Sequence, residues 1–156
     1  MTGHRRIDPP ELAPPAGFSY AVVAAPGRTV HLAGQIARDR EGRIVGVGDI
    51  VTQFARCLSN LLTALNAAGG RPEHLVSMRI HLVDVSQYRR RSRDIDAVWQ
   101  QLIGDWYPAM VSVGVARLWD DAALIEVEGI AVVPDPRRPE DSPAAETADP
   151  AGTRHG

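Results

Sequence analysis

Two segments of the chain repeat their apolar residues at helical spacing. The first begins after Asp49, a favourable N-cap residue, and ends at Gly69, with apolar residues that would share one side of a helix: Ile50, Phe54, Cys57, Leu58, Leu61, Leu62 and Leu65. The second runs roughly from Ser92 to Leu102. We therefore expect two helices, the first with one buried stripe.

Shorter apolar runs predict strands. Residues 19–25 and 28–36 are joined by Pro26 and Gly27, which is typical of a β-hairpin, and further strands are expected in 74–85, 110–117 and 123–133. The order ββαβαββ predicts an α+β fold, a mixed sheet with both helices on one face, each helix crossing between neighbouring strands. The other face would lack cover in a monomer, as at an oligomer interface.

The stretch "MVSVGVAR", residues 110–117, has two different faces. Val111, Val113 and Val115 would share one face, while the long thioether of Met110 and the hydroxyl of Ser112 lie on the other. A continuous valine stripe is typical of a core. We expect the valines to lie under the helices and the other face to line a cleft.

Composition favours one globular domain. The chain has 156 residues, of which 44% are apolar and 23% charged. Residues 17–134 form the predicted domain, between a proline-rich flexible segment (1–16) and a disordered tail (135–156). Because no apolar run could span a bilayer or serve as a signal peptide, we expect a cytoplasmic protein without membrane contact.

Charge and reactive residues exclude several kinds of chemistry. A formal net charge of −2 gives no basis for nucleic-acid binding. The chain has no lysine, so Schiff-base chemistry with pyridoxal phosphate is excluded. Cys57 is the only cysteine and reads as a buried, inert thiol, and the histidines are scattered, so we expect no metal site.

The element order and a series of short motifs resemble the Rid family (RidA or YjgF, reactive intermediate deaminases). The matching features are "GFSY" at Gly17, "AGQ" at Ala33, Gln53, Asn60, "AAG" at Ala67, "LV" at Leu75, Asp84, "YPA" at Tyr107, "ARL" at Ala116 and "IEVEGIAV" at Ile125. The resemblance implies a chorismate-mutase-like fold and a homotrimer whose sheets line a barrel, with clefts between subunits. Active members hydrolyse imines or enamines there, without a cofactor.

The resemblance also implies site residues, and three of them depart from the family pattern. Met110 takes the place of the arginine that clamps the substrate carboxylate, Ser112 that of a cysteine, and Ala33 that of a serine. Tyr20 and the catalytic Glu126 are retained, and Asp96 falls near a helical asparagine. The cleft is thus expected to bind substrate through Tyr20, Ala33, Asp96, Met110 and Ser112.

Losing the arginine changes the expected substrate. An arginine fork gives a carboxylate two charge-assisted hydrogen bonds, each worth roughly 1.5 to 3 kcal/mol, and methionine gives none. A carboxylate beside Met110 would also be desolvated without a partner. We expect a reactive imine or enamine that is not a standard 2-imino acid; the alternative is a non-catalytic member that binds a small ligand or a protein.

Two charged clusters allow more than one interpretation. Glu126 and Glu128 share a strand face, where they could perform acid-base chemistry, face water, or pair with Arg79 or Arg117. The arginine run 89–93 sits at the predicted start of the second helix, where positive charge opposes the helix dipole. It could be a solvated helix start, an anion contact or a contact between subunits.

Overall fold

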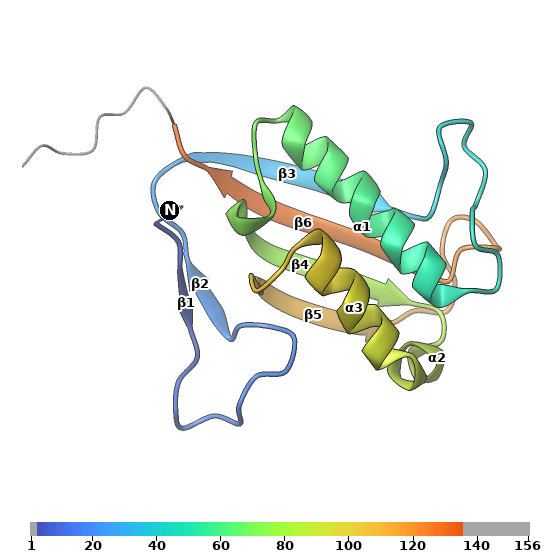
Figure 1. Ribbon diagram of the computed structural model, residues 1–156, viewed down its shortest axis with the longest axis horizontal. Coiled ribbons are helices and arrows are strands. Elements are labelled where there is room, and N and C mark those ends of the chain that lie inside the picture. The colour runs from blue at the N-terminus through green and yellow to red at the C-terminus, as the bar shows by residue number, and fades with distance from the viewer. Residues whose placement is uncertain (1–2, 136–156) are drawn as a thin grey trace, which may run out of the picture.

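The computed structural model describes residues 3–135, which fold around a four-stranded mixed sheet (Figure 1). The strands lie in the order β3-β6-β4-β5, with bounds β3 Arg28–Gln35, β4 Leu75–Leu82, β5 Ala109–Gly114 and β6 Ile125–Val133. β6 is antiparallel to both of its neighbours, and β4 is parallel to β5. β3 and β5 therefore form the two edges of the sheet.

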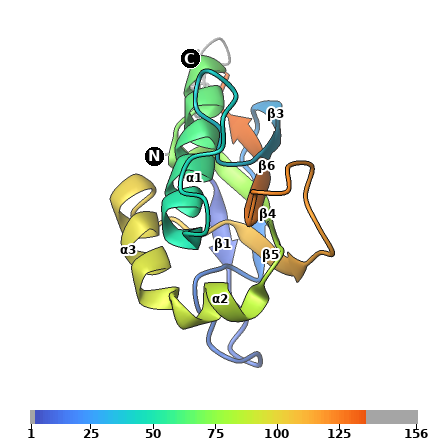
Figure 2. The same cartoon turned by 90° about the vertical axis from the view of Figure 1, so that its right-hand side faces the viewer.

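The helices pack on one face of this sheet, which confirms the predicted α+β fold class (Figure 2). They are α1 (Ile50–Ala67), α2 (Val85–Arg90) and α3 (Ser92–Leu102), with a short 3-10 helix at Pro72–His74. The bounds of α3 are those predicted. α2 was not predicted, although its N-cap Asp84 accepts a hydrogen bond from the backbone N–H of Gln87.

Both ends of α1 are set by local sequence. The Asp49 side chain accepts a hydrogen bond from the backbone N–H of Val51. At the other end the Gly70 N–H donates to the Leu65 carbonyl and the Gly69 N–H to the Asn66 carbonyl, a Schellman motif. Gly69 has φ of 80° and follows the C-cap residue Ala68, so the C-cap lies one residue before the predicted one.

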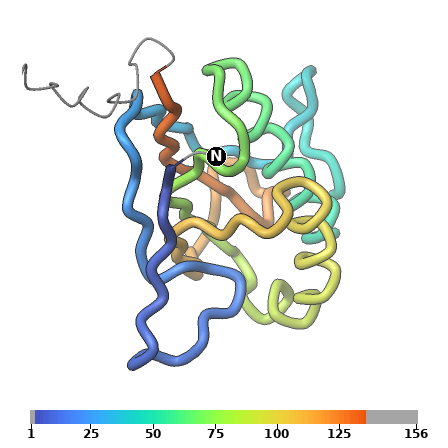
Figure 3. The backbone as a smooth tube through the Cα atoms, turned by 60° about the vertical axis from the view of Figure 1, so that its left-hand side comes forward, coloured from blue at the N-terminus to red at the C-terminus, as the bar shows by residue number. Residues whose placement is uncertain are grey.

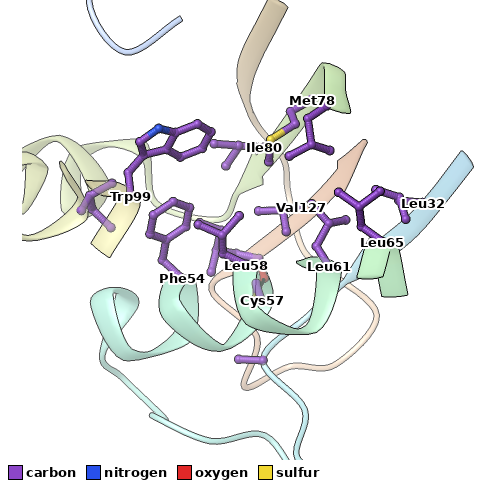
Figure 4. Close-up of a cluster of buried hydrophobic side chains, with 14 of the residues drawn as sticks. Leu32, Phe54, Cys57, Leu58, Leu61, Leu65, Met78, Ile80, Trp99 and Val127 are labelled. Carbon is purple, nitrogen blue, oxygen red and sulfur yellow. Dashed lines mark hydrogen bonds between the residues drawn. The ribbon is translucent and has the colours of Figure 1, made fainter. Parts of the chain in front are cut away.

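The hydrophobic core lies between α1, α3 and the covered face of the sheet (Figure 4). Side chains from α1 pack against those from the strands and against Trp99 of α3; the fully buried ones include Phe54, Leu58, Leu61, Leu65, Ile80, Ile125 and Val127. Cys57 is buried among them, where desolvation chiefly raises the pKa of its thiol to about 12. Its thiol is accordingly protonated and inert at neutral pH.

The predicted hairpin of residues 19–36 is wrong. β2 (Ala21–Val23) does not pair with β3 but with β1 (Arg5–Ile7), in a separate antiparallel ladder beside the start of β5 (Figures 1 and 3). His4 directs this pairing, because its Nδ1 accepts the Ala25 N–H at 2.9 Å while its Nε2 lies 2.8 Å from the Val132 carbonyl oxygen.

The termini differ from expectation in one respect. Residues 1–16 were predicted to lack regular structure, yet Arg5–Ile7 forms a strand, since its partner β2 supplies the hydrogen bonds that so short a segment cannot supply itself. The predicted tail, 135–156, lies outside the described residues except for Asp135.

The crossover prediction is correct for only one connection. α2 and α3 join β4 to β5, which are parallel neighbours. α1 joins β3 to β4, but β6 lies between these two strands. The last strand of the sheet is thus inserted into its centre, which local sequence patterns do not reveal.

The faces of β5 are the reverse of those predicted. In the parallel register Met110 lies beside Met78, and Ser112 lies beside Ile80. Met78 and Ile80 are buried under the helices, whereas Val111 lies beside the exposed Arg79. Val111 is 45% exposed on the face without helices. β-branched residues fit any pleated surface, so a valine stripe does not distinguish a helix-covered face from one left open in the single chain.

Candidate functional site

A cavity of about 830 Å³ opens between α3, β5 and the chain just before β2. Three residues predicted for the site, Asp96, Met110 and Ser112, line it together. The other lining residues are mostly aromatic, apolar or small: Ala16, Gly17, Phe18, Tyr88, Ser92, Ile95, Trp99, Gln100, Tyr107 and Val111. A volume of this size suits a small-molecule ligand.

Regular spacing on two elements brings these side chains to one cavity. On α3, Ser92, Asp96 and Gln100 recur every four residues and share one side of the helix. On β5, Met110 and Ser112 are two residues apart and share one face of the strand. The edge position of β5 leaves that face only partly covered by α3.

A fixed aromatic wall supports the cavity. The rings of Trp99 and Tyr107 stack with centroids 5.4 Å apart and planes 6° from parallel. Gln100 Nε2 donates to the Tyr107 hydroxyl oxygen at 2.8 Å, and the Trp99 indole N–H donates to the Trp106 carbonyl at 3.2 Å. These bonds hold the wall in one arrangement.

Asp96 is the one charged residue among the described residues that line this cavity. Its charge acts on Tyr88: burial first, and the Asp96 carboxylate second, raise the pKa of that phenol to about 12. Tyr88 therefore keeps its proton at neutral pH and remains a hydrogen-bond donor. The cavity is an apolar, aromatic site with one anionic side chain.

Tyr20 lies at the edge of this region. It lines a smaller cavity of about 300 Å³ that also contains Met110 and Ala109. Its hydroxyl donates to the Ala13 carbonyl at 2.8 Å, and its ring contacts Phe18 edge to face. Ser19 next to it is buried and attaches this segment to the start of β5, since its N–H donates to the Pro108 carbonyl at 3.0 Å.

Glu126 lies on the opposite face of the sheet. It contributes to a separate cavity of about 510 Å³ that is lined by His81, Val115, Arg117, Leu118, Trp119 and Asp121. His81 stands directly across from it in the β4–β6 register. The Glu126 side chain also lies against Gly34, whose missing side chain leaves the room for it.

The neighbouring Glu128 is held by cations. Its carboxylate lies 3.0 Å from Arg79 Nη1 and 3.6 Å from His81 Nε2, the second contact being an ion pair only when His81 is protonated. Pairing with Arg79 was one of the interpretations of Glu126 and Glu128, and it is confirmed for Glu128. Ala33 lies on the same face and lines a groove that also contains Arg79 and Glu128.

Within one chain the predicted site residues form two groups. The first, which we call the β5 cavity group, comprises Asp96, Met110 and Ser112, with Tyr20 beside Met110. The second, the open-face group, comprises Ala33 and Glu126 on β3 and β6. A sheet separates the two groups, so one chain does not bring all of these residues to one substrate.

The arginine run differs from the prediction. Arg89 and Arg90 lie in the last turn of α2, where positive charge is favourable, and not at the start of the second predicted helix. Arg91 links the two helices, and its Nε lies 2.7 Å from Asp94 Oδ2. The helix-dipole penalty inferred for this run does not apply to Arg89 and Arg90.

Sequence reasoning missed part of the cavity wall. Tyr88 and Gln100 were not predicted, and for Trp99 packing or an interface was favoured over stacking on a substrate. A signal was available for Ser92 and Gln100, because each lies four residues from Asp96 and would share its side of a helix. Tyr88 carried no such signal, since the helix that holds it was not predicted.

Among residues 3–135, no group of three or more His, Cys, Asp or Glu side chains could hold a metal ion. No helix in the same range is long and apolar enough to cross a bilayer.

Known proteins resemble this chain over most of its length. The family model described as Endoribonuclease L-PSP matches residues 10–133. A RutC family protein of Pyrococcus abyssi is 32% identical over 121 residues, 78% of this chain and 91% of that protein. A 2-iminobutanoate/2-iminopropanoate deaminase of Capra hircus is 27% identical over 128 residues, 82% of this chain and 90% of that protein.

A solved structure extends the similarity to the fold. The crystal structure of YyfB from Yersinia pestis, a protein of unknown function of the conserved Rid family, is 34% identical with a TM-score of 0.77. The match covers 85% of this chain and 100% of the YyfB chain. Together with the family model over residues 10–133, these similarities show that the chain belongs to the Rid (YjgF, endoribonuclease L-PSP) family.

Proposed function

We propose that this protein hydrolyses a reactive imine or enamine that lacks the carboxylate of a standard 2-imino acid. The observation that carries the proposal is Met110 in the wall of the β5 cavity, where the family resemblance puts the carboxylate-binding arginine. No described residue lining that cavity is cationic. Relatives named as deaminases support the imine or enamine as substrate class.

The proposed chemistry needs only water and a carboxylate. Glu126 takes a proton from a water molecule, whose oxygen bonds to the carbon of the C=N group, and passes that proton to the nitrogen. The new hydroxyl group then gives up its proton, which Glu126 also passes to the nitrogen as the C–N bond breaks. Ammonia leaves, or an amine where the nitrogen carries a substituent, and the carbon keeps the oxygen as a carbonyl. No electron acceptor or cofactor enters this balance.

The proposed site lies between two copies of the chain. Because the β5 cavity group and the open-face group lie on opposite faces of the sheet, Glu126 of one copy would complete the cavity of the next. The sheet edges β3 and β5 belong to different groups, so a head-to-tail contact between them can repeat around a closed ring. A homotrimer is the ring that the family resemblance implies, and light scattering tests it directly.

The test follows imine decay with purified protein. An amino-acid oxidase generates 2-imino acids, whereas imines without a carboxylate are made by mixing an amine and an aldehyde; the remaining imine is trapped and measured. We expect acceleration only for the second class. Acceleration of 2-imino acids at the rate of an arginine-containing relative would contradict the proposal.

Variants separate the residues. Replacing Glu126 by Gln is expected to lower the accelerated rate by about 10²- to 10⁴-fold, the usual contribution of a general acid-base. Glu128→Gln is the matched control, since Glu128 lies two residues away on the same face and is engaged by Arg79. Met110→Arg should bring acceleration to 2-imino acids.

One observation favours a second candidate, a member that binds its ligand without converting it. Glu126 does not line the cavity that holds Met110 within one chain. If the protein is a monomer in solution and Glu126→Gln changes no rate on any imine, this binding function replaces the catalytic one.

A further inference from the structure

We infer that the β5 cavity selects a small organic cation, a protonated amine or iminium group carried on an apolar body. This inference rests on the proposed function only in taking the same cavity as the substrate site, and it adds the charge of the ligand. It is carried by the charge of Asp96 and by the aromatic side chains of the cavity wall.

The charge of the wall comes from Asp96. None of the ion pairs found within residues 3–135 includes Asp96, and no arginine or histidine of the described chain lines the cavity. The Asp96 carboxylate is exposed on the cavity side of α3, where it can reach a ligand. It would repel an anionic ligand and attract a cationic one.

A neighbouring carboxylate on the same helix shows the contrast. Asp94, two residues earlier, is engaged by Arg91 at 2.7 Å and does not line the cavity. Arg91 thus engages Asp94, and no ion pair within residues 3–135 engages Asp96. The Asp96 carboxylate is therefore available to a ligand in the cavity.

The remaining wall suits the apolar body of such a ligand and also its charge. Phe18, Tyr88, Trp99 and Tyr107 supply aromatic rings, although Trp99 and Tyr107 cover one face of each other by stacking, and Met110 supplies a polarizable thioether. The Tyr88 hydroxyl keeps its proton and can donate but does not add positive charge. A cavity of about 830 Å³ has room for a ring and a short amine.

The proposed assembly would add side chains of both signs to this wall. Glu126 of a second copy would bring a further carboxylate, and His81 and Arg117, which line the same cavity as Glu126, would come with it. The preference for a cation therefore belongs to the wall that one chain forms.

Calorimetric titration with three matched probes tests the ligand charge. Benzylammonium, benzyl alcohol and benzoate share one ring and nearly one size but carry positive, zero and negative charge. We expect benzylammonium to bind about tenfold more tightly than benzyl alcohol, because its ammonium group can pair with the Asp96 carboxylate beside the aromatic rings. Benzoate should bind least. Equal or tighter binding of benzoate, or no binding of any probe, overturns the inference.

Two variants locate the effect. Asp96→Asn should remove most of the advantage of benzylammonium and leave benzyl alcohol unchanged, whereas Asp94→Asn should change neither. An unchanged preference in Asp96→Asn overturns the assignment, and Met110→Arg gives an independent arm, since it should reverse the order in favour of benzoate. The titration measures no turnover, so a wild-type protein that prefers benzylammonium but hydrolyses no imine refutes the proposed reaction alone.

Discussion

The two faces of the sheet are made from the same strands but are stabilised differently. Under the helices, Ile80 and Val127 are fully buried among apolar side chains. On the other face, Arg79, His81 and Glu128 form a partly exposed charged network, beside the exposed Val111 and Ile130. Burial thus holds the fold within one chain, while the open face keeps groups that can interact with another molecule.

Removing a large side chain from the covered face should give the largest effect on stability. Phe54 is fully buried, so Phe54→Ala is expected to lower the free energy of unfolding by about 3 to 5 kcal/mol. Val111→Ala on the open face should lower it by less than about 0.5 kcal/mol per chain. Urea unfolding at one fixed protein concentration measures both.

The same two variants also test whether the open face packs against another copy of the chain. If copies pack through the open face, the effect of Val111→Ala will be larger at high protein concentration, where the copies associate, and will shrink on dilution, whereas that of Phe54→Ala will not depend on concentration in this way. A large effect of Val111→Ala that does not depend on concentration would contradict the view of an open face.

Loosening the helix that covers the sheet should have an intermediate effect. Asp49 caps α1, and its hydrogen bond from the Thr52 hydroxyl is the first cause that lowers the pKa of its carboxyl group. Asp49→Ala is expected to lower the free energy of unfolding by about 1 kcal/mol at neutral pH. Thermal unfolding measures the difference.

Measuring the same stability difference at low pH is the control for this prediction. Since the folded-state pKa lies below the usual aspartate value of about 3.9, the carboxylate stabilises the fold fully above that value. The stabilisation is lost as the pH falls through the folded-state pKa. The gap between wild type and Asp49→Ala should therefore narrow below about pH 4, and a gap that stays constant would assign the loss to something other than this charge.

A small effect on stability is also expected for the charged network. Glu128 and Arg79 are both partly exposed, so Glu128→Gln should cost less than about 1 kcal/mol, and less again at high salt. Chemical unfolding at low and high salt tests this. A larger and salt-independent loss would mean that the open face is buried against a second copy.

Local pattern predicted those parts of the fold that local residues determine. α1 and α3 could be recognised because their buried residues recur at helical spacing and, in α1, Asp49 and Gly69 mark the ends. β1 could not, since three residues carry no usable alternation and depend on contacts of His4 with Ala25 and Val132. α2 left one signal, the N-cap Asp84, which was not used for this purpose.

The candidate site was predictable in composition but not in arrangement. Family resemblance supplied Asp96, Met110 and Ser112, and the structure brings these three to one cavity. The separation of Glu126 from them depends on which face of the sheet each strand turns to the helices, and that follows from the register of β4 with β5 and β6. Residue types alone gave the opposite orientation for Val111.

The central position of β6 also constrains how the protein can fold during synthesis. β3 and β4 have no hydrogen bonds to each other, because both pair with β6, which is the last of the described strands to leave the ribosome. Until Ile125–Val133 has emerged, the two strand edges that β6 later covers stay unpaired and α1 has an incomplete surface to pack on. Such edges can bind other chains, so we expect prompt emergence of β6 to limit aggregation of the nascent chain.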